Sequence, residues 1–268
     1  MRKHAGSDSR FRKNILTASK NNFSRIILAL DLQGSSQTQL LRTGKSLIEN
    51  TASYICAIKL GRPTVLNLGM EKTRTLIAIS HANELPCIID DKLGDIDDVN
   101  LAISQAYFDL GFDCIIVNPI AGWKGGLEPV FKLAHKAGKG VIVLVYMSNP
   151  GATEAYGQLV LRSSHGKPRP QYEIFAEKAD LWGADGAVVG GNRPEIVKKV
   201  REKLHNGIDI YSPGIGAQGG KVLRASDAGS DFFIIGRSIT RSRNPEHAVQ
   251  NFARQSVSQT FSTLASMP

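Results

Sequence analysis

Eight apolar runs recur along the chain between residues 25 and 236, and longer amphipathic segments separate them. The runs are rich in β-branched residues and apolar almost throughout, which is typical of parallel strands buried on both faces. We predict strands at Arg25–Asp31, Ile55–Gly61, Pro86–Asp90, Phe112–Asn118, Val141–Tyr146, Gly186–Gly190, Ile208–Ser212 and Asp231–Gly236.

The segments between the predicted strands have the spacing of amphipathic helices. Two of the apolar faces comprise Leu40, Leu41, Gly44, Leu47 and Ile48, and Leu101, Ala102, Gln105, Phe108 and Leu110. Pro194 is expected to open a further helix, with Asn192 as a candidate cap. Three Gly-x-Asp triplets, starting at Gly111, Gly183 and Gly229, predict a helix end followed by a short loop into the next strand.

Strands that alternate with helices predict an α/β fold, and eight such units point to a closed (β/α)8 TIM barrel. A doubly wound open sheet is the main competitor, but no G-x-G-x-x-G motif follows the first strand. The 268 residues fit a single barrel domain of residues 23–268, preceded by a basic extension of residues 1–22. In that extension Phe11, Ile15 and Leu16 predict a short helix that covers the barrel base.

The net charge of +9 suits a protein that binds phosphorylated small molecules or one that binds nucleic acid. The chain has no stripe of basic residues interleaved with aromatic ones and no known nucleic-acid motif, so we do not expect nucleic-acid binding. No apolar run approaches the roughly 20 residues of a membrane helix, and the N-terminus lacks the apolar centre of a secretory signal. A cytoplasmic protein without a membrane partner is expected, with Cys56, Cys87 and Cys114 reduced and buried.

In a barrel of this kind, residues at the carboxyl ends of the strands face the active site. Those positions here are Asp31, Lys59, Asp90, Lys92, Ser148, Pro213 to Gln218, Gly236 and Arg237. The glycines at 214, 216, 219 and 220 let backbone N–H groups approach an anion, and Arg237 offers several donors in one plane. We therefore predict a phosphate site beside a cluster of alternating charges.

The densest cluster of charge runs from Asp90 to Asp98. Its carboxylates suit Mg²⁺, but the ammonium group of Lys92 would compete with a metal among them. A lysine held between carboxylates keeps its proton, because negative charge nearby favours the charged form. Lys92 is therefore a candidate proton donor, whereas Asp97 and Asp98 fit the acidic first turn of a helix.

The segment from Asp90 through Lys92 to Asp95 has the form D-x-K-x-x-D, and Ile96 continues it. This segment resembles the signature of the orotidine 5′-monophosphate decarboxylases. Five further blocks stand in the order of that family: LALDL, IKLGRP, MSNPGA, SPGIGAQGG and IIGRSI. The resemblance extends from Arg25 to Pro245 and implies a TIM-barrel enzyme of de novo pyrimidine biosynthesis.

The resemblance implies roles for the charged residues. Lys59 and Asp31 would bind the ribose hydroxyls. They would also hold Lys92 and Asp90 in a network of alternating charges. Asp90 would face the substrate carboxylate, and Lys92 would protonate C6 of the pyrimidine as CO2 leaves. Asp95 would enter the site of a neighbouring subunit, which implies a homodimer. The reaction would need no cofactor and no metal.

The remaining implied contacts are with the nucleotide substrate. Ser148 would contact the pyrimidine ring, and Gln218, Gly236 and Arg237 would hold the 5′-phosphate. The resemblance also counts Ile96 and Pro213 among the substrate-binding residues. The chain departs from the family at Val99, where many relatives have Thr or Ser, at Asn149, where some have His, and in a long polar connection over residues 149–170. A functional or mobile loop is expected there.

Two other functions stay open. The Mg²⁺-dependent sugar-phosphate relatives, 3-keto-L-gulonate 6-phosphate decarboxylase and hexulose-6-phosphate synthase, share D-x-K-x-x-D but carry an acid where this chain has Lys59. Loss of activity with a chelator would favour them. An inactive barrel that only binds a nucleotide is the other alternative, and for such a protein Lys92 would be dispensable.

Overall fold

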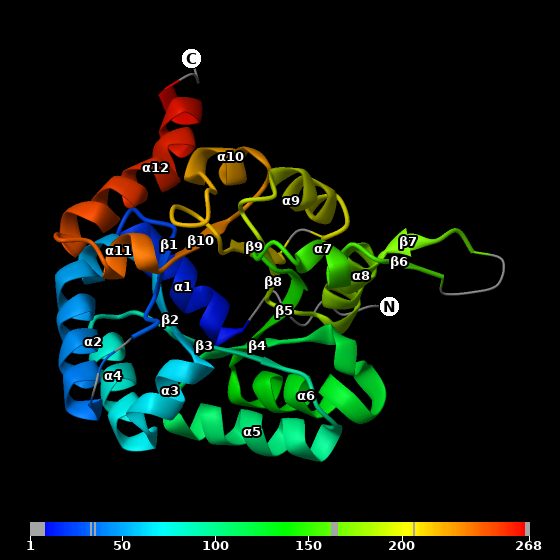
Figure 1. The fold of residues 1–268 in the computed structure, drawn as a ribbon, viewed down its shortest axis with the longest axis horizontal. Helices are drawn as coiled ribbons and strands as arrows, with labels where there is room; N and C mark the ends of the chain where they lie inside the picture. Colours follow the sequence, from blue (N-terminus) through cyan, green and yellow to red (C-terminus); the bar gives the residue numbers. More distant parts are fainter. Residues whose placement is uncertain (1–8, 33, 35, 162–165, 206, 266–268) are drawn as a thin grey trace.

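Eight strands form a closed, parallel barrel at the centre of the molecule (Figure 1). The structure is a computed structural model that describes residues 9–32, 34, 36–161, 166–205 and 207–265. The strands are β1 (Ile26–Ala29), β2 (Ala57–Gly61), β3 (Cys87–Leu93), β4 (Cys114–Val117), β5 (Gly140–Tyr146), β8 (Gly186–Val189), β9 (Asp209–Ser212) and β10 (Phe232–Ile235). Successive strands are neighbours and β10 closes on β1, so the predicted (β/α)8 barrel is confirmed.

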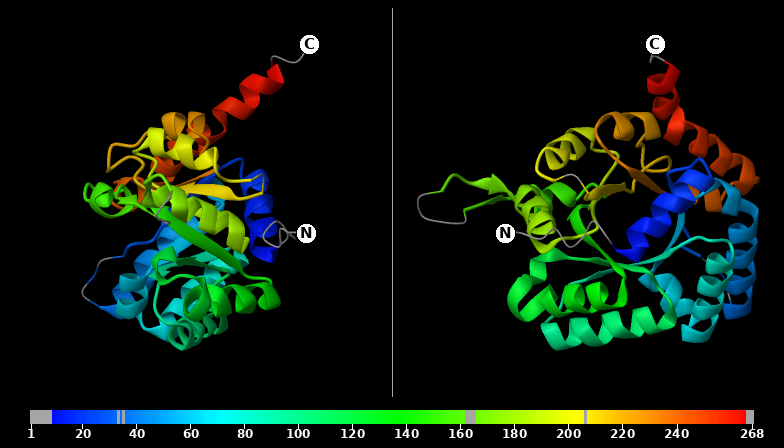
Figure 2. Two further views of the ribbon diagram at one scale, coloured as in Figure 1. Left: turned by 90° about the vertical axis from the view of Figure 1, so that its right-hand side faces the viewer. Right: turned by 180° about the vertical axis from the view of Figure 1, so that it is seen from behind.

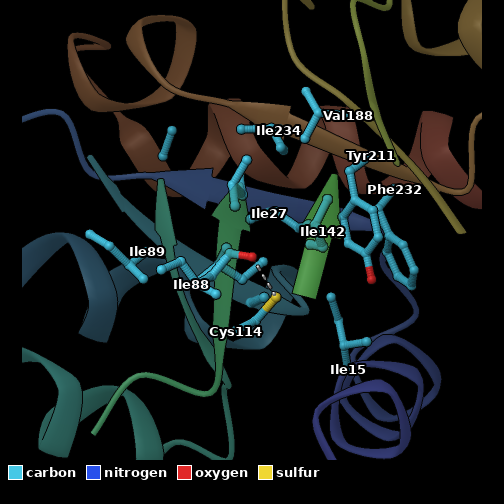
Figure 3. Close-up of a cluster of buried hydrophobic side chains, with 14 of the residues drawn as sticks. Ile15, Ile27, Ile88, Ile89, Cys114, Ile142, Val188, Tyr211, Phe232 and Ile234 are labelled. Carbon is cyan, nitrogen blue, oxygen red and sulfur yellow. Dashed lines mark hydrogen bonds between the residues drawn. The ribbon is translucent and has the colours of Figure 1, made fainter. Parts of the chain in front are cut away.

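The barrel is filled by apolar side chains. Closure pairs Ile26 of β1 with Phe233 of β10 in parallel register. Figure 3 shows part of this core, including Ile27, Ile88, Cys114, Ile142, Val188, Tyr211, Phe232 and Ile234. Seven of the strands are buried along their whole length, as the unbroken apolar runs predict, and β3 departs from this only at Asp90 and Lys92. The three cysteines are buried and free.

Helices surround the barrel as an outer ring (Figure 1). They are α2 (Gln37–Thr51), α3 (Arg62–Leu68), α4 (Met70–Ala82), α5 (Asp97–Leu110), α6 (Glu128–Ala137), α8 (Gln171–Trp182), α9 (Pro194–Arg201), α10 (Val222–Asp227), α11 (Arg237–Thr240) and α12 (Pro245–Ala265). The predicted face of α2 is buried at Leu40, Gly44 and Leu47, whereas Leu101 of α5 is exposed. Within the described ranges, no helix is long and apolar enough to cross a membrane.

The three Gly-x-Asp triplets do connect a helix to a strand, as predicted. Gly111 and Gly183 end α5 and α8 with a positive φ, which glycine adopts without steric cost. The aspartate of each triplet also has a structural task that the sequence did not reveal. Their carboxylates accept hydrogen bonds from the N–H groups of Cys87, Val141 and Ile210, at 2.9, 2.8 and 2.7 Å. These aspartates therefore fasten neighbouring strands together at the base of the barrel.

Helix α1 (Arg10–Asn21) crosses the base of the barrel, in the foreground of the right-hand view of Figure 2. Phe11 and Ile15 are buried there, as predicted, but Leu16 is exposed. Phe11 packs directly on Gly140, where an added Cβ would come within 2.4 Å of the phenyl ring. The start of β5 therefore needs a glycine for α1 to dock.

One local expectation was wrong, and another underestimated a strand. The cap position of α9 is Arg193, without a side-chain hydrogen bond. The amide N–H of Asn192 donates to the Ser148 carbonyl at 2.9 Å, and its Oδ1, the atom that would accept from a helix N–H, has no hydrogen-bond partner among the described residues. The functional or mobile loop expected over residues 149–170 stays a prediction; its described part contains α7 (Ala152–Tyr156) and the antiparallel pair of β6 (Leu159–Val160) and β7 (Arg169–Pro170). Strand β3 extends to Leu93, beyond the predicted end at Asp90.

Candidate active site

A cavity of about 390 Å³ opens at the carboxyl ends of the barrel strands. It brings together nine predicted residues: Asp31, Lys59, Asp90, Lys92, Ser148, Pro213, Gln218, Gly236 and Arg237. Its floor is formed by apolar side chains of the barrel, among them Ile116, Leu144 and Val188. The cavity therefore has an apolar base beneath a rim of charge, and an apolar surrounding strengthens electrostatic interactions with a bound molecule.

Four of the charged side chains form one alternating chain of ion pairs. The ammonium of Lys59 lies 3.6 Å from Asp31 Oδ1 and 3.1 Å from Asp90 Oδ2. Lys92 Nζ donates to the other oxygen of Asp90 at 2.7 Å. Each Asp90 oxygen thus accepts a hydrogen bond from a lysine ammonium group. Lys92 lies at one end of the network, with about a third of its side chain exposed.

Burial and charge act against each other in this network. Burial alone lowers the pKa of Lys59, but the Asp90 and Asp31 carboxylates outweigh it and raise that pKa above its ordinary value. For Asp90, burial raises the pKa, whereas Lys59 and Lys92 together bring it below the usual range. Asp90 and Lys59 are therefore both charged at neutral pH, and the site presents fixed charges to a substrate.

The backbone at Lys92 adopts an unusual conformation. Lys92 has φ +53°, in the left-handed region that residues with a side chain seldom enter. It lies in an irregular part of β3, where the pairing with β4 shifts between Ile89 and Leu93. Such a bulge changes the local direction of the strand, and Lys92 contacts Asp90, two residues earlier on the same side of β3. Neither the hydrophobic pattern nor the motif predicts this left-handed conformation.

The opposite end of the cavity is built from main chain and arginine. Residues 213–220 form a tight loop in which Gly216 N–H donates to Gly220 O at 2.9 Å and Gly220 N–H to Gly214 O at 3.0 Å. Positive φ angles at residues 214, 216 and 219 account for the glycines there. Gly236 and Arg237 follow β10 beside this loop and line the same cavity.

Ser148 and Gln218 connect the two ends of the cavity. The Ser148 hydroxyl donates to Gln218 Oε1 at 3.0 Å, which joins the end of β5 to the loop after β9. A molecule that fills the cavity therefore contacts both segments at this bridge. Because the bridge leaves the Gln218 amide N–H group out of the hydrogen bond, that group can donate to an anion.

Asp95 and Ile96 lie outside the cavity of their own chain. Both are exposed, Ile96 by 61%. Their loop is nevertheless held in place by the buried Asn100, whose Oδ1 accepts from the Asp95 N–H at 2.9 Å and whose amide donates to Gly126 O at 3.0 Å. The predicted helix start at Asp97 is confirmed.

The structure adds cavity residues that the motif did not identify. Arg241 lines the cavity together with Arg237. The spacing of four residues in RSITR was a usable signal, because residues i and i+4 share one face of a helix. Met147 and Asn149 line the wall on either side of Ser148. In the part of the chain that the structure describes, no group of three or more His, Cys, Asp or Glu side chains is placed to hold a metal ion.

Known proteins resemble this chain in both sequence and fold. Residues 24–252 match the family model described as "Orotidine 5'-phosphate decarboxylase / HUMPS family". Orotidine 5′-phosphate decarboxylase of Pyrococcus abyssi is 35% identical over 225 residues, 84% of this chain and 95% of the relative. The structure of Leishmania donovani OMP decarboxylase superposes with a TM-score of 0.82 at 25% identity, covering 94% of this chain and 99% of the other. UMP synthase of the same organism gives 0.83 at 26% identity; the match covers 94% of this chain but only 56% of that longer one.

Proposed function

Because the chain belongs to the orotidine 5′-phosphate decarboxylase / HUMPS family, we propose that it converts orotidine 5′-monophosphate to uridine 5′-monophosphate and CO2, with Lys92 as the proton donor. The observation that carries this proposal is the alternating chain of charges at the cavity mouth. It ends in an ammonium group held 2.7 Å from Asp90 and open to the cavity.

The chemistry follows from where charge develops. Breaking the bond between C6 and the carboxyl group releases CO2 and leaves an electron pair on C6, where resonance helps little. A fixed ammonium beside that carbon stabilises the developing charge, because it needs no reorganisation during the reaction. Lys92 then transfers a proton from Nζ to C6 and regains one from solvent. These steps use side chains alone, so the scheme needs no cofactor.

Asp90 and Lys59 prepare this step. Asp90 accepts hydrogen bonds from both lysines and so fixes the position of the Lys92 ammonium. Its second partner, Lys59, keeps Asp90 ionised through its own positive charge. Asp31, more exposed at 61% of its side chain, stands at the outer end of the network, where the ribose hydroxyls would bind.

The 5′-phosphate would bind at the opposite end, against Gln218, Gly236 and Arg237. Arg237 is exposed and offers a planar set of N–H donors, and Gln218 still has an amide donor. The phosphate lies far from the reacting bond, but its binding energy can be used to order the site. Pro213 and Ser148 line the cavity between the two ends, where the pyrimidine would lie.

The decisive experiment mixes the purified protein with orotidine 5′-monophosphate and follows the pyrimidine absorbance. We expect conversion both with and without a chelator, and a fall in kcat of about 1,000-fold or more in Lys92→Ala. Lys139→Ala is the matched control, since Lys139 also pairs with an aspartate, Asp113 at 3.2 Å, but at the barrel base. No conversion by the wild-type protein would refute the proposal.

A Mg²⁺-dependent sugar-phosphate enzyme is the alternative that the family leaves. Against it stands Lys59, whose ammonium occupies one oxygen of Asp90 while Lys92 occupies the other. A cation bound to Asp90 would have to displace at least one of these groups. Activity that disappears with the chelator and returns with Mg²⁺ would favour this alternative.

We also propose a homodimer in which Asp95 and Ile96 reach the site of the neighbouring subunit. Their exposure, on a loop that Asn100 holds rigid, supports this arrangement. Lys92→Ala and Asp95→Asn would each be inactive alone. Random mixing of the two should restore about a quarter of wild-type activity, because half of the dimers then contain one intact site. No recovery from mixed dimers would contradict the shared site.

Two further parts of the proposal concern organisation and location. We place catalysis in residues 23–268, preceded by a basic extension of residues 1–22 in which α1 supports the barrel base. The three free, buried cysteines fit a reducing compartment such as the cytoplasm.

A further inference from the structure

We propose that Arg62 is a positioning residue for Lys92, and that it acts by clamping the main chain and the carboxylate of Asp91. This inference rests on the proposed function, because it assigns a role in delivering the Lys92 proton. It concerns residues on the outer side of the barrel, behind the cavity, that do not line the site.

The geometry of β3 separates Asp91 from its two neighbours. Asp90 and Lys92 face the cavity, whereas the buried Asp91 points outward towards the helices. There its Oδ1 lies 2.9 Å from Nε of Arg62, the first residue of α3. Tyr107 of α5 donates its hydroxyl to the same oxygen at 3.1 Å. The carboxylate thus ties β3 to both covering helices.

Arg62 also holds the main chain of Asp91. Its Nη2 donates to the Asp91 carbonyl oxygen at 2.6 Å. That oxygen belongs to the peptide group whose nitrogen is that of Lys92, so its position fixes the plane from which φ of Lys92 is measured. A planar guanidinium that donates to both a carboxylate and a nearby carbonyl restrains the orientation of that peptide group as well as its distance.

The contacts of Arg62 restrain β3 where its pairing with β4 is interrupted. Between Ile89 and Leu93 the β3 chain advances four residues while β4 advances two, from Ile115 to Val117. The intervening residues, Asp90 to Lys92, have no paired position on β4. In the same stretch Lys92 has φ +53°, a conformation that persists only where surrounding contacts determine it. Arg62 supplies such a contact.

Tyr107, the other partner of the Asp91 carboxylate, helps to hold that carboxylate in place. Burial, together with the Asp91 carboxylate, raises the pKa of the Tyr107 hydroxyl, so this group remains a donor. Its ring packs edge-on against Phe112 at 5.7 Å between centroids, which fixes the direction of the hydroxyl. Asp91 therefore receives a charged and a neutral donor, and its buried charge is compensated without involving the cavity network.

The test compares Arg62→Met with a matched control, Arg201→Met. Arg201 makes the same kind of clamp, with Nη1 3.1 Å from Asp231 Oδ2 and Nη2 donating to the Ile208 carbonyl at 2.7 Å. That clamp lies at the base of the barrel, away from the cavity. Both variants lose an Arg–Asp pair, so a loss of stability alone is common to them.

We expect Arg62→Met to lower kcat for orotidine 5′-monophosphate by about 10- to 100-fold with KM changed less than about threefold, because misplacing a reacting group mainly affects the transition state. Arg201→Met should keep kcat within about twofold at temperatures where both variants are folded. Arg62→Lys keeps the charge but loses the fork, and should recover little of kcat.

The inference is overturned by an unchanged kcat in Arg62→Met, or by equal losses of kcat in Arg62→Met and Arg201→Met. It is also overturned by a crystal structure of Arg62→Met in which φ of Lys92 and its contact with Asp90 are unaltered. A wild-type protein that does not turn over the nucleotide would instead refute the proposed function, so the two failures are distinguishable.

Discussion

At the scale of single residues, the lysine that carries the proposed chemistry is also a source of strain. Its left-handed backbone costs on the order of 1 kcal/mol for a residue with a side chain and nothing comparable for glycine. In ordinary strand positions glycine is the less stable choice, because it loses more conformational freedom on folding. At position 92 we therefore expect the opposite, with glycine giving a more stable protein than alanine.

We predict that Lys92→Gly unfolds with a free energy about 1 kcal/mol higher than Lys92→Ala, measured by urea denaturation. Both variants remove the same ammonium group from Asp90, so the comparison isolates the backbone term. Ile89, a regular ladder position on the same strand, gives the contrast: Ile89→Gly should be less stable than Ile89→Ala. A lower stability of Lys92→Gly than of Lys92→Ala would show that the left-handed conformation is not strained.

At the scale of elements, α1 acts as a plug for the barrel base, on the side opposite the cavity. Phe11 is buried against Gly140, at the start of β5, whereas Ser148 in the cavity follows the end of the same strand. Ser9 and Arg12 add bonds to Asp185 and Asp209, the latter at 3.0 Å. These contacts all lie at the barrel base, so we expect this element to act on stability and not on the chemical step.

We predict that Phe11→Ala lowers the free energy of unfolding by about 3–5 kcal/mol while kcat of the folded enzyme is unchanged. Gly140→Ala should be comparably harmful in the wild type, since its Cβ would lie 2.4 Å from the ring, but much less so in the Phe11→Ala background. Denaturation of the two single variants and the double variant measures this coupling. Additive effects would contradict direct packing between the two residues.

How much of each element could be predicted depended on the type of signal. Runs such as GVIVLVY, which forms β5, are buried on both faces, so hydrophobicity alone predicts them as strands. The last residues of β3 are not predicted in this way, because Asp90 to Lys92 have the composition of a loop and their conformation depends on contacts from α3 and α5. Asn192 was misjudged for a similar reason: its amide has a distant partner, Ser148, which local sequence cannot reveal.

The site was more predictable than the contacts that support it. Nine of its residues follow from a single rule, that strand ends converge at one face of a barrel. The pairing of Lys59 with Asp90 was implied by the family resemblance. The pairing of Arg62 with Asp91 was not, because it depends on the register of adjacent strands and on the bulge, which hydrophobic patterns do not encode.

At the scale of the whole molecule, the two ends of the barrel use carboxylates for different purposes. At the cavity end, two lysines hold Asp90 in its charged form. At the base, Asp113, Asp185 and Asp231 accept backbone N–H groups of neighbouring strands. Their surroundings differ in charge: His81 and Lys139 contact Asp113, whereas Asp185 is buried with only a hydroxyl and a backbone donor. The base should therefore respond to pH in two opposite ways.

Asp185 should make the fold less stable as pH rises. Burial raises its pKa to about 6, from an ordinary value of 3.8. The native state therefore binds this proton more tightly than the unfolded chain does, so the associated stability is fully present below about pH 4 and is lost as pH rises through about 6. The shift of about two pKa units corresponds to about 3 kcal/mol.

We predict that the free energy of unfolding of the wild type, minus that of Asp185→Asn, falls by about 3 kcal/mol between about pH 4 and pH 6 and is flat above. Urea denaturation at a series of pH values measures it. Asp113→Asn is the matched control of opposite sign: burial raises the Asp113 pKa, but His81, the Cys87 N–H and Lys139 bring it below the ordinary value. Its contribution should be lost as pH falls, not as it rises. Parallel curves for the two variants would show that the charged groups around each aspartate do not set the direction of its pKa shift.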